Sequence, residues 1–346
     1  MDVVDHDYQL YVHRSLNRRT VVDRSNPIEE FNEEEFVTRY RLSKDIFMHV
    51  LGTISHDINS GLIPPLLKFA TCLRYYATGS TQLIHADLHG ISQPMVSRIV
   101  RDVSAALASL RKTHIYFPAD IQGKRNVCAK FSDEIRINNV IGAINCTHIS
   151  VIPPKESAAA FYNRKQNFSI NVQVVCDSDG IVQNIVARWP GSTHDARIFS
   201  NSKLKRRLED GDLRNFILFG DSGYALTENL LTPVSNPQTC AQEDYNLHFI
   251  RTRLVIERTF GVIKKIHFFA CIGNRNKLAT KLSTSTATII AVFVLHNIRV
   301  RGKMNTEITD RDHDLHTFDT GLGGSNAHNS NGRVLRRTLI ERYFNV

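Results

Sequence analysis

The sequence lacks long apolar runs and clustered cysteines. No uninterrupted hydrophobic stretch reaches the roughly 18 residues that a membrane-spanning helix needs, and the N-terminal "MDVVDHDYQLYVHR" has no apolar centre of the kind found in signal peptides. The six cysteines are widely spaced and form no CxxC pair, which argues against a zinc site and a disulfide framework. We therefore expect an intracellular protein without a membrane span, whose cysteines are small buried apolar residues.

The N-terminus is acidic, whereas the rest of the chain has a net excess of positive charge. The 346 residues carry a net charge of +9, but residues 1–36 hold nine acids against four arginines, so the remainder carries +14. We define residues 1–35 as an acidic N-terminal arm. A body this basic suits a polyanionic partner, although the same charge would also serve solubility alone.

The first part of the chain has helical signals. A hydrophobic content of 42% allows a full core, and we expect two domains, the first a helical domain over residues 36–115. One helix is expected in "FVTRYRLSKDIFMHVLGTI", with Ser43 as N-cap. Another is expected in "PPLLKFATCLRYYATG", which opens with prolines and closes on Gly79.

The segment "STQLIHADLHGISQPMVSRIVRDVSAALASL" predicts a helix-turn-helix. A short helix over about residues 81–89 is followed by a turn at Gly90 and a second helix, with Ser92 as N-cap and Pro94 in its first turn. Such a second helix can enter the major groove of DNA. The candidate DNA-binding residues on its exposed side are Gln93, Ser97, Arg98 and Arg101. A plain three-helix packing unit would have a similar sequence, so both interpretations stay open.

From about residue 136 the pattern changes to that of strands. "NNVIGAIN", "FSINVQVVC" and "IVQNIVARW" are rich in Val and Ile, and "DSDG" (177–180) between the last two is typical of a hairpin turn. One helix is expected over "STHDARIFSNSKLKRRLE", a strand in "NFILFGDSGY", and then two helices, "RLVIERTFGVIKKI" and "LSTSTATIIAVFVLHNIRV". This order predicts an α/β layer fold.

The C-terminal tail has a different composition. "TFDTGLGGSNAHNSNG" is rich in Gly, Asn and Ser, which predicts a disordered linker over residues 316–333. A last helix is expected over residues 334–346. It would dock back on the fold or stay exposed.

Three acids stand at places where a nuclease would use them. Asp221 directly follows "FILFG", Asp195 lies in "WPGSTHDAR", and Glu257 lies on "RLVIERTFG". Two-metal phosphodiester chemistry needs carboxylates that converge from separate segments on Mg²⁺ or Mn²⁺ ions about 4 Å apart. Strand ends are suitable places for such residues, because the strand fixes the backbone.

Each acid also has a structural explanation. Asp195 would favour the dipole of a helix in its first turn, and Asp221 would suit a turn. Glu257 would pair with Arg253 one turn earlier. Five basic residues surround the glutamate, and they suit either a solvated face or an approaching phosphate backbone: Arg251, Arg253, Arg258, Lys264 and Lys265.

Five ordered motifs carry a resemblance to a known family. "INCTHISV", "WPGSTHDARIF", "FGDSGY", "IERTFGVIKK" and "VLHNI" resemble the successive signatures of the PIF/Harbinger transposases and of the nucleases derived from them. The resemblance runs from "RYRLSKDIF" to "LHNI". It implies an RNase H-like DDE nuclease domain over residues 136–300, a mixed sheet flanked by helices, preceded by the helical DNA-binding region.

The resemblance implies a catalytic and metal-binding role, with Mg²⁺ or Mn²⁺, for four positions. The HD-motif aspartate falls on Asp195, the GD-motif aspartate on Asp221, the glutamate on Glu257 and the first aspartate on Asn145.

The resemblance also implies partners and a location. The family acts on DNA and works with a Myb-like or trihelix DNA-binding partner that helps to carry it into the nucleus, so a nuclear and also cytoplasmic location is expected. The acidic arm would contact that partner or be a plain solvated arm, and a homo-oligomer stays open. His148 and His194 accompany the first two motifs, and each would contact substrate or metal, or be a satisfied buried histidine.

Asn145 departs from the family pattern. An amide oxygen still coordinates a metal, but as a weaker, neutral ligand, so a large loss of rate is expected. Asp177, after the second strand, would be a substitute ligand. Two hypotheses follow: a slow metal-dependent DNA endonuclease, or a domesticated DNA-binding or scaffold protein that has lost cleavage. The three retained acids favour the first hypothesis, and Asn145 favours the second.

Overall fold

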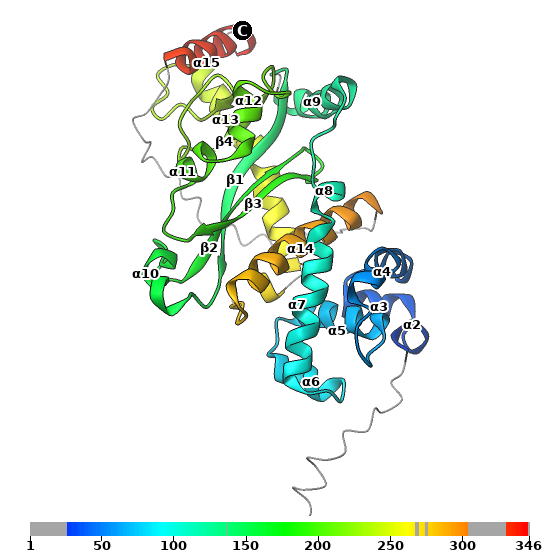
Figure 1. The fold of residues 1–346 in the computed structure, drawn as a ribbon. Coiled ribbons are helices and arrows are strands. Elements are labelled where there is room, and N and C mark those ends of the chain that lie inside the picture. Colours follow the sequence, from blue (N-terminus) through cyan, green and yellow to red (C-terminus); the bar gives the residue numbers. More distant parts are fainter. Residues whose placement is uncertain (1–25, 136, 267–269, 274–275, 304–329, 345–346) are drawn as a thin grey trace, which may run out of the picture.

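The computed structural model describes residues 26–135, 137–266, 270–273, 276–303 and 330–344. The N-terminal part is a bundle of helices, and the part from residue 140 is a sheet with helices on both faces (Figure 1). Within these ranges, none of the helices combines the length and the apolar character that a membrane crossing requires.

The N-terminal bundle begins ahead of the expected boundary. Its helices in the described residues are α2 (Pro27–Glu30), α3 (Glu33–Tyr40), α4 (Lys44–Ile58), α5 (Pro65–Thr78), α6 (Gln82–Leu88), α7 (Gln93–Ser109) and α8 (Arg111–His114). As predicted, Ser43 caps α4, accepting a hydrogen bond from Ile46 N–H (3.3 Å). Gly79, at φ +62°, ends α5 in the left-handed conformation.

Residues 27–30 and 33–35 are helical, which differs from the expected arm over residues 1–35. Asn32 and Glu35 form a capping box at the start of α3, with bonds of 2.9 and 3.0 Å. The three glutamates at the start of α3 therefore lie where they favour the helix dipole. Phe36 buries this helix in the core, so the helical domain includes residues that charge alone assigned to the arm.

The helices and the turn of the expected helix-turn-helix lie where the sequence predicts them. α6 ends at Leu88, Gly90 takes a positive φ of 58°, and α7 follows Ser92. One face of α7 is buried against α14 (Leu282–Arg301), α5 and α6. The candidate DNA-binding residues lie on the exposed side of α7: Gln93, Ser97, Arg98 and Arg101. Their DNA-binding role stays a prediction.

The sheet is mixed and has the order β3-β2-β1-β4-β5. Its strands are β1 (Val140–Ser150), β2 (Ser169–Cys176), β3 (Val182–Pro190), β4 (Ile217–Gly220) and β5 (Leu230–Leu231). β1, β2 and β3 pair antiparallel, whereas β4 pairs parallel with β1 and with β5. This arrangement confirms a mixed α/β domain and is consistent with an RNase H-like fold.

Helices cover both faces of this sheet. The remaining helical elements are α9 (Ile121–Ile135), η1 (Lys155–Ser157), α10 (Ala158–Phe161), α11 (Asp195–Ser200), α12 (Lys203–Glu209), α13 (Cys240–Gly261), the π-helical η2 (Val262–Ile266), η3 (Ala270–Ile272) and α15 (Ser330–Tyr343). On the α11 face, Phe199 and Leu208 join Ile144 in one hydrophobic cluster. On the opposite face, the α13 face, Ile256 and Val292 pack with β2 and β3.

Several elements differ from the sequence expectation. The single helix expected over residues 192–209 is two helices, because Ser202 interrupts it and caps α12 through Lys205 N–H (3.1 Å). α13 begins at Cys240, well before the expected start, with Thr239 as its N-cap. Neither α9 nor β5 was predicted. Cys240 is exposed and Cys146 half-buried, so the expectation of buried cysteines holds for only four of the six.

The C-terminal helix docks back on the sheet domain. α15 begins at Ser330, so residues 330–333 of the expected linker are helical, and the rest of that linker lies outside the described residues. Gly332, in this added first turn, is buried, and a Cβ there would lie 2.9 Å from backbone atoms of Thr227, so glycine allows the close packing. Phe344 packs edge-on against Tyr245 of α13.

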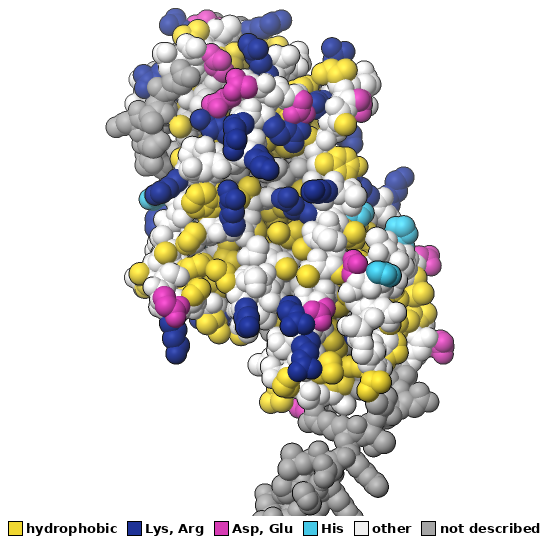
Figure 2. All heavy atoms as spheres, viewed as in Figure 1, with side chains coloured by type: hydrophobic (Ala, Val, Ile, Leu, Met, Phe, Trp, Pro, Cys, Tyr) yellow, Lys and Arg dark blue, Asp and Glu magenta, His cyan; other side chains and the backbone are white. Residues whose placement is uncertain are grey.

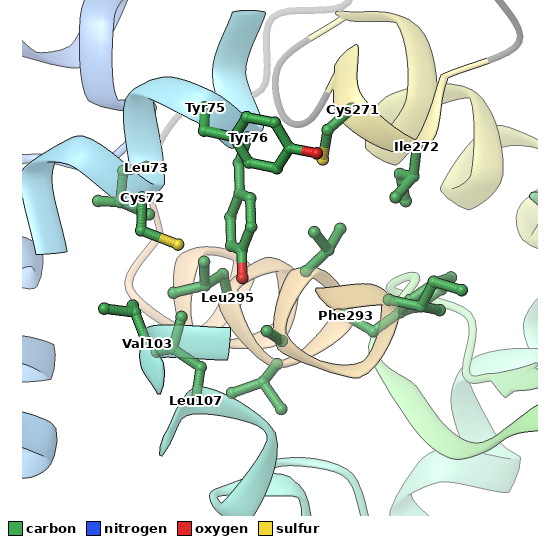
Figure 3. Packing of buried hydrophobic residues seen from close by; sticks show 14 of the residues in the cluster. Cys72, Leu73, Tyr75, Tyr76, Val103, Leu107, Cys271, Ile272, Phe293 and Leu295 are labelled. Atoms are coloured by element: carbon green, nitrogen blue, oxygen red, sulfur yellow. The ribbon is translucent and has the colours of Figure 1, made fainter. Parts of the chain in front are cut away.

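One hydrophobic cluster joins the helical bundle to the sheet domain. Figure 3 shows side chains from α5, α7, α14 and η3 meeting in it, with Tyr76 pointing from α5 toward α14. Ser104 of α7 contacts both Tyr76 Oη and Thr288 Oγ1 of α14, the latter at 3.0 Å. The two expected domains therefore share a core.

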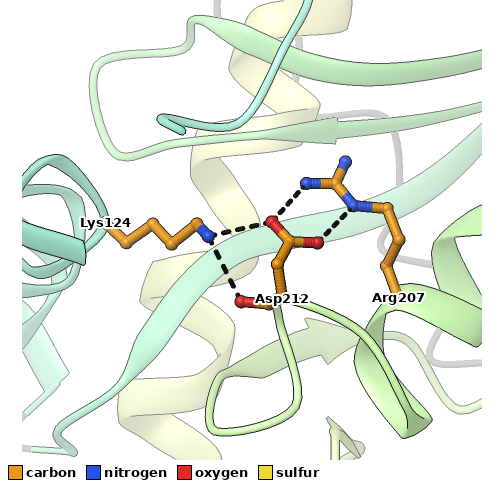
Figure 4. A network of polar contacts seen from close by, with 3 residues as sticks. All are labelled: Lys124, Arg207 and Asp212. Carbon is orange, nitrogen blue, oxygen red and sulfur yellow. Dashed lines mark hydrogen bonds and ion pairs between the residues drawn. The ribbon is translucent and has the colours of Figure 1, made fainter. Parts of the chain in front are cut away.

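A polar network fixes the other end of the sheet domain. Asp212 accepts hydrogen bonds from Lys124 of α9 (2.8 Å) and from Arg207 of α12 (2.8 Å for each of two bonds) (Figure 4). These two cations hold the pKa of Asp212 well below its usual range. The network ties α9 and α12 to the turn that leads into β4.

Candidate active site

Alternate side chains of β1 point to opposite faces of the sheet. Thr147 Oγ1 accepts a hydrogen bond from Lys264 Nζ in η2 (2.6 Å), so Thr147 and Asn145 point to the α13 face. Cys146 points to the α11 face, where its thiol lies 3.3 Å from the Tyr224 hydroxyl. Asn145 is half-buried, and its Oδ1 accepts a hydrogen bond from Cys146 N–H (2.8 Å).

Asp221 follows β4 at the same level of the sheet as Asn145. The parallel register pairs Ile144 with Gly220, so Asn145 and Asp221 are each the next residue on adjacent strands. A Cβ at position 220 would lie 3.1 Å from Ile144 Cγ2, so glycine allows this close approach. Asp221 Oδ1 also accepts a hydrogen bond from Gly223 N–H (2.9 Å), as expected for a turn aspartate.

The carboxyl of Asp221 lies within electrostatic reach of a second acid. Burial raises the pKa of Asp221, and the negative charge of Asp195 raises it further. The positive charges of Arg253 and Arg164 act in the opposite direction. The structure thus brings together two acids that stand 26 residues apart in the chain.

Asp195 is positioned by a residue that sequence reasoning missed. It is the first residue of α11, as the helix-dipole explanation expects. Asn171 Nδ2 donates to Asp195 Oδ1 (2.8 Å) and to the Thr193 carbonyl (2.9 Å). The available signal was polar side chains at alternate positions of an otherwise apolar strand, since Asn171 and Gln173 both lie within β2.

Glu257 pairs with an arginine on its own helix. Arg253 donates to Glu257 Oε1 from Nη2 (2.6 Å) and Nε (3.0 Å), which is the ion pair expected from their spacing. The guanidinium of Arg253 is also one of the charges that act on Asp221. Arg253 therefore contacts Glu257 directly and acts electrostatically on Asp221.

Lys264 is half-buried and its ammonium is hydrogen-bonded within the fold, so the solvated-face explanation fails for it. Its Nζ donates to Thr147 Oγ1 and to the His148 carbonyl (2.9 Å). Burial, with a smaller contribution from the charge of Lys165, lowers the pKa of Lys264 to about 8. Seven residues separate Lys264 from Glu257, a spacing that returns to the same side of a helix, so the sequence contained a signal for a role at the site.

The other basic residues near Glu257 differ in their exposure to solvent. Arg251 and Arg258 are exposed, as a solvated basic face requires, whereas Arg253 is half-buried in its ion pair. The side chain of Lys265 lies outside the described residues.

The two motif histidines, His148 and His194, differ in their exposure to solvent. His148 is half-buried, and its Nδ1 lies 2.9 Å from Ser169 Oγ. Burial lowers the pKa of His148, while the nearby Asp195 raises it. His194 is exposed and precedes α11 as its N-cap residue, so the expectation of a buried histidine fails there.

Asp177 lies in the hairpin turn, apart from the other acids. Its Oδ1 accepts hydrogen bonds from Asp179 N–H (3.0 Å) and Ile181 N–H (2.9 Å). Burial raises its pKa to about 6, and the charges acting on it come from Asp179 and Lys130. Asp177 therefore serves the β2–β3 turn and does not replace Asn145.

The oxygen atoms of the candidate residues are suitable ligands for a divalent cation, but their side chains are not arranged as a complete metal site. In the described part of the chain, no group of three or more His, Cys, Asp or Glu residues is arranged to hold a metal ion. The carboxylate oxygens of Asp195 and Asp221 and the amide oxygen of Asn145 are hard ligands suited to Mg²⁺ or Mn²⁺. The repulsion between the two carboxylates, visible in the raised pKa of Asp221, is what a bound cation would relieve.

Comparison with protein families places all four positions in one domain. A model of the DDE superfamily endonuclease domain matches residues 144–297. The matched range begins one residue before Asn145 and contains Asp195, Asp221 and Glu257.

The chain is similar to proteins from animals and plants over most of its length. It is 30% identical to HARBI1 of Bos taurus, a protein named as a candidate nuclease, over 88% of this chain and 86% of that protein. It is 28% identical to the ALP1-like protein of Arabidopsis thaliana, over 76% of this chain and 70% of that protein. A second Arabidopsis relative, Antagonist of Like Heterochromatin Protein 1, is 27% identical over 56% of this chain and 55% of its own. No solved structure matches the chain.

Proposed function

Because the chain belongs to the Harbinger transposase-derived nuclease family and carries its DDE superfamily endonuclease domain, we propose that it is a divalent-metal-dependent DNA endonuclease. The observation that carries this proposal is the electrostatic effect of Asp195 on Asp221; Glu257 is ion-paired to Arg253, whose charge also acts on Asp221. Two neighbouring carboxylates that repel each other are stable when a cation is shared between them.

Each acid has a proposed role. Asp195 and Asp221 would hold Mg²⁺ or Mn²⁺, and Glu257 would join them if its ion pair with Arg253 opened. When bound, the metal supplies Lewis acidity and an activated water for phosphodiester hydrolysis. Asn171 fixes the orientation of Asp195 through its 2.8 Å hydrogen bond.

Asn145 would join the site from the α13 face of the sheet, the side of Glu257, and at a cost in rate. Its Oδ1 is engaged with the Cys146 N–H, so the oxygen offers a metal less electron density than a free carboxylate would. The site also carries one negative charge fewer than the family pattern. We therefore propose an active enzyme that is slower than one with aspartate at this position.

The helical domain supplies a proposed DNA contact. Gln93, Ser97, Arg98 and Arg101 are exposed on α7, although Arg101 pairs with Asp102 (2.7 Å). On the face shown in Figure 2, Lys and Arg are the more frequent charged side chains over the sheet domain, which suits a DNA partner. If Arg98→Ala with Arg101→Ala left DNA affinity and its salt dependence unchanged, the helix-turn-helix assignment would be wrong.

A nuclear as well as cytoplasmic location and a Myb-like or trihelix partner form part of the proposal. They rest on family resemblance, and immunofluorescence of the tagged chain with and without such a partner tests them.

A second candidate function is a DNA-binding scaffold without cleavage. Asn145 favours it, and so does one Arabidopsis relative, which is named for antagonism of a heterochromatin protein rather than for cutting DNA. Retention of Asp195, Asp221 and Glu257 favours the nuclease.

Nicking of supercoiled plasmid tests the proposed function. The wild-type chain is expected to nick DNA in Mn²⁺ or Mg²⁺ and not in EDTA. Asp221→Asn should lower the rate at least about 100-fold, as loss of a principal electrostatic contact does. Asp210→Asn, which changes an exposed acid at the end of α12, is the matched control and should keep the wild-type rate. Equal nicking by both variants would overturn the proposal.

A further inference from the structure

The loop of residues 162–168, which we call the basic loop, connects α10 to β2 and is held rigid from within. An antiparallel bridge between Tyr162 and Phe168 closes it. Asn163 is 5% exposed, and its Oδ1 accepts hydrogen bonds from Lys165 N–H (2.9 Å) and Asn167 N–H (3.2 Å). Its backbone N–H donates to the Asn167 carbonyl (2.9 Å). The loop is therefore preorganised around one buried amide side chain.

The base of the basic loop is fastened to the candidate active site. Asn163 Nδ2 donates to Ser169 Oγ (2.8 Å), which also contacts His148 Nδ1 (2.9 Å). The segment that leads to Asp195 is bonded to the residues before the loop, because Ser192 N–H donates to the Ala160 carbonyl (3.1 Å). A Cβ at position 191 would lie 2.3 Å from Ser169 Oγ, so Gly191 permits this close contact.

The tip of the basic loop carries two cations that are free of ion pairs. Arg164 and Lys165 are exposed, and neither forms a salt bridge with any residue that the structure describes. Arg164 lies near enough to lower the pKa of both Asp221 and His148, and Lys165 lowers that of Lys264. Tyr162, 47% exposed, stands beside them. The loop thus presents positive charge next to the acids on a fixed support.

We propose that the basic loop binds the phosphate backbone of the DNA strand that enters the acidic site. A phosphate approaching Asp195 and Asp221 is repelled by their carboxylates, and Arg164 and Lys165 offset that repulsion. Because Asn163 holds the loop in place before binding, little conformational entropy is lost when it meets DNA. The inference rests on the proposed function, since it names where the substrate of that site is held.

Fluorescence anisotropy of a labelled DNA duplex, titrated in EDTA at several salt concentrations, tests the inference without cleavage. Arg164→Ala with Lys165→Ala should weaken binding about tenfold and reduce the slope of log affinity against log salt by about 2, one unit per lost phosphate contact. Both side chains are exposed, so the fold should be retained. Asn163→Ala changes no charge, yet it should weaken binding about three- to tenfold because the tip loses its support.

The matched control removes two adjacent exposed cations elsewhere, Arg111→Ala with Lys112→Ala on α8. This pair should leave the affinity and the slope nearly unchanged. An equal loss in the control and loop variants would mean that only net charge matters, and that would overturn the inference, as would wild-type binding by the loop variant. Plasmid nicking by the wild-type chain is measured separately, so failure of the loop is distinguishable from failure of the nuclease.

Discussion

At the scale of single residues, Arg253 supplies positive charge to two of the acids, Glu257 and Asp221. Its guanidinium binds Glu257 at 2.6 Å and acts on Asp221, so it offsets part of the negative charge of these acids. A metal that recruits Glu257 must break this ion pair. Metal binding by Glu257 would therefore cost the free energy of the charge-assisted hydrogen bonds from Arg253 to Glu257.

Replacing Arg253 should strengthen metal binding. Arg253→Met is expected to lower the Kd for Mn²⁺ about tenfold, because a hydrogen bond to a charged group contributes about 1.5–3 kcal/mol. Electron paramagnetic resonance of free Mn²⁺ measures this directly. Arg251→Met removes the same charge from an exposed position of α13 and should have a smaller effect. Equal Kd values for the two variants would show that only the overall charge matters.

Asp177 gives the stability of the fold a pH dependence. Its pKa is about 6 in the folded chain, raised by burial from 3.8, so ionisation destabilises the folded state as the pH rises from about 4 through 6. Asp177→Asn keeps an acceptor for Asp179 N–H and Ile181 N–H and removes the buried charge. The variant should exceed the wild type in unfolding free energy by up to ~3 kcal/mol at pH 8. This advantage should vanish near pH 4, and urea unfolding across this range checks it. A constant difference at every pH would contradict the assignment.

At the scale of elements, α15 completes the hydrophobic cover of α13. Phe344 is 6% exposed and lies 5.8 Å from the Tyr245 ring, measured between ring centroids. Arg336 of α15 also donates to the Pro233 carbonyl (2.8 Å). The C-terminal helix is therefore part of the folded domain.

Truncating Phe344 should destabilise the chain. Phe344→Ala is expected to cost about 3 kcal/mol, as other large-to-small core substitutions do, and denaturant unfolding measures it. Val334→Ala, at a position of α15 that is 65% exposed, should stay within about 0.5 kcal/mol of the wild type. A loss below about 1 kcal/mol for Phe344→Ala would mean that α15 is not docked in solution.

The elements that the sequence predicted are those with strong local patterns. β2 and β3 were expected within one residue of their bounds, because runs of Val and Ile mark buried strands. β5 has only two residues and exists through its pairing with β4, which no local pattern encodes. The polar first half of α13 and the charged surface of α9 likewise hide helices that tertiary packing stabilises.

The acids of the site were predicted, but their partners were not. Asp195, Asp221 and Glu257 stand in motifs that can be recognised along the chain. The hydrogen bond from Asn171 to Asp195 and the one from Lys264 to Thr147 join residues 24 and 117 positions apart. Such contacts follow from the register of the sheet and the position of α13, which the sequence does not reveal locally.

At the scale of the whole molecule, the helical bundle and the nuclease domain form one body. α14 packs on α7 on one side and on β3 on the other, and Ser104 bonds to Thr288 across their interface. DNA held by α7 would therefore stay in a fixed relation to DNA held beside Asp195 and Asp221. A rigid relation between a DNA-reading helix and a cutting site is what an endonuclease that cuts at a defined place requires.

The most direct test of the central claim compares plasmid nicking by the wild-type chain and by Asn145→Asp in Mn²⁺. We predict that the wild type nicks DNA in a metal-dependent way and that Asn145→Asp is faster by roughly 10- to 1000-fold, because the restored carboxylate adds a charged ligand. No nicking by the wild type above the EDTA background, together with activity in Asn145→Asp, would contradict the account and identify the natural chain as a DNA-binding scaffold.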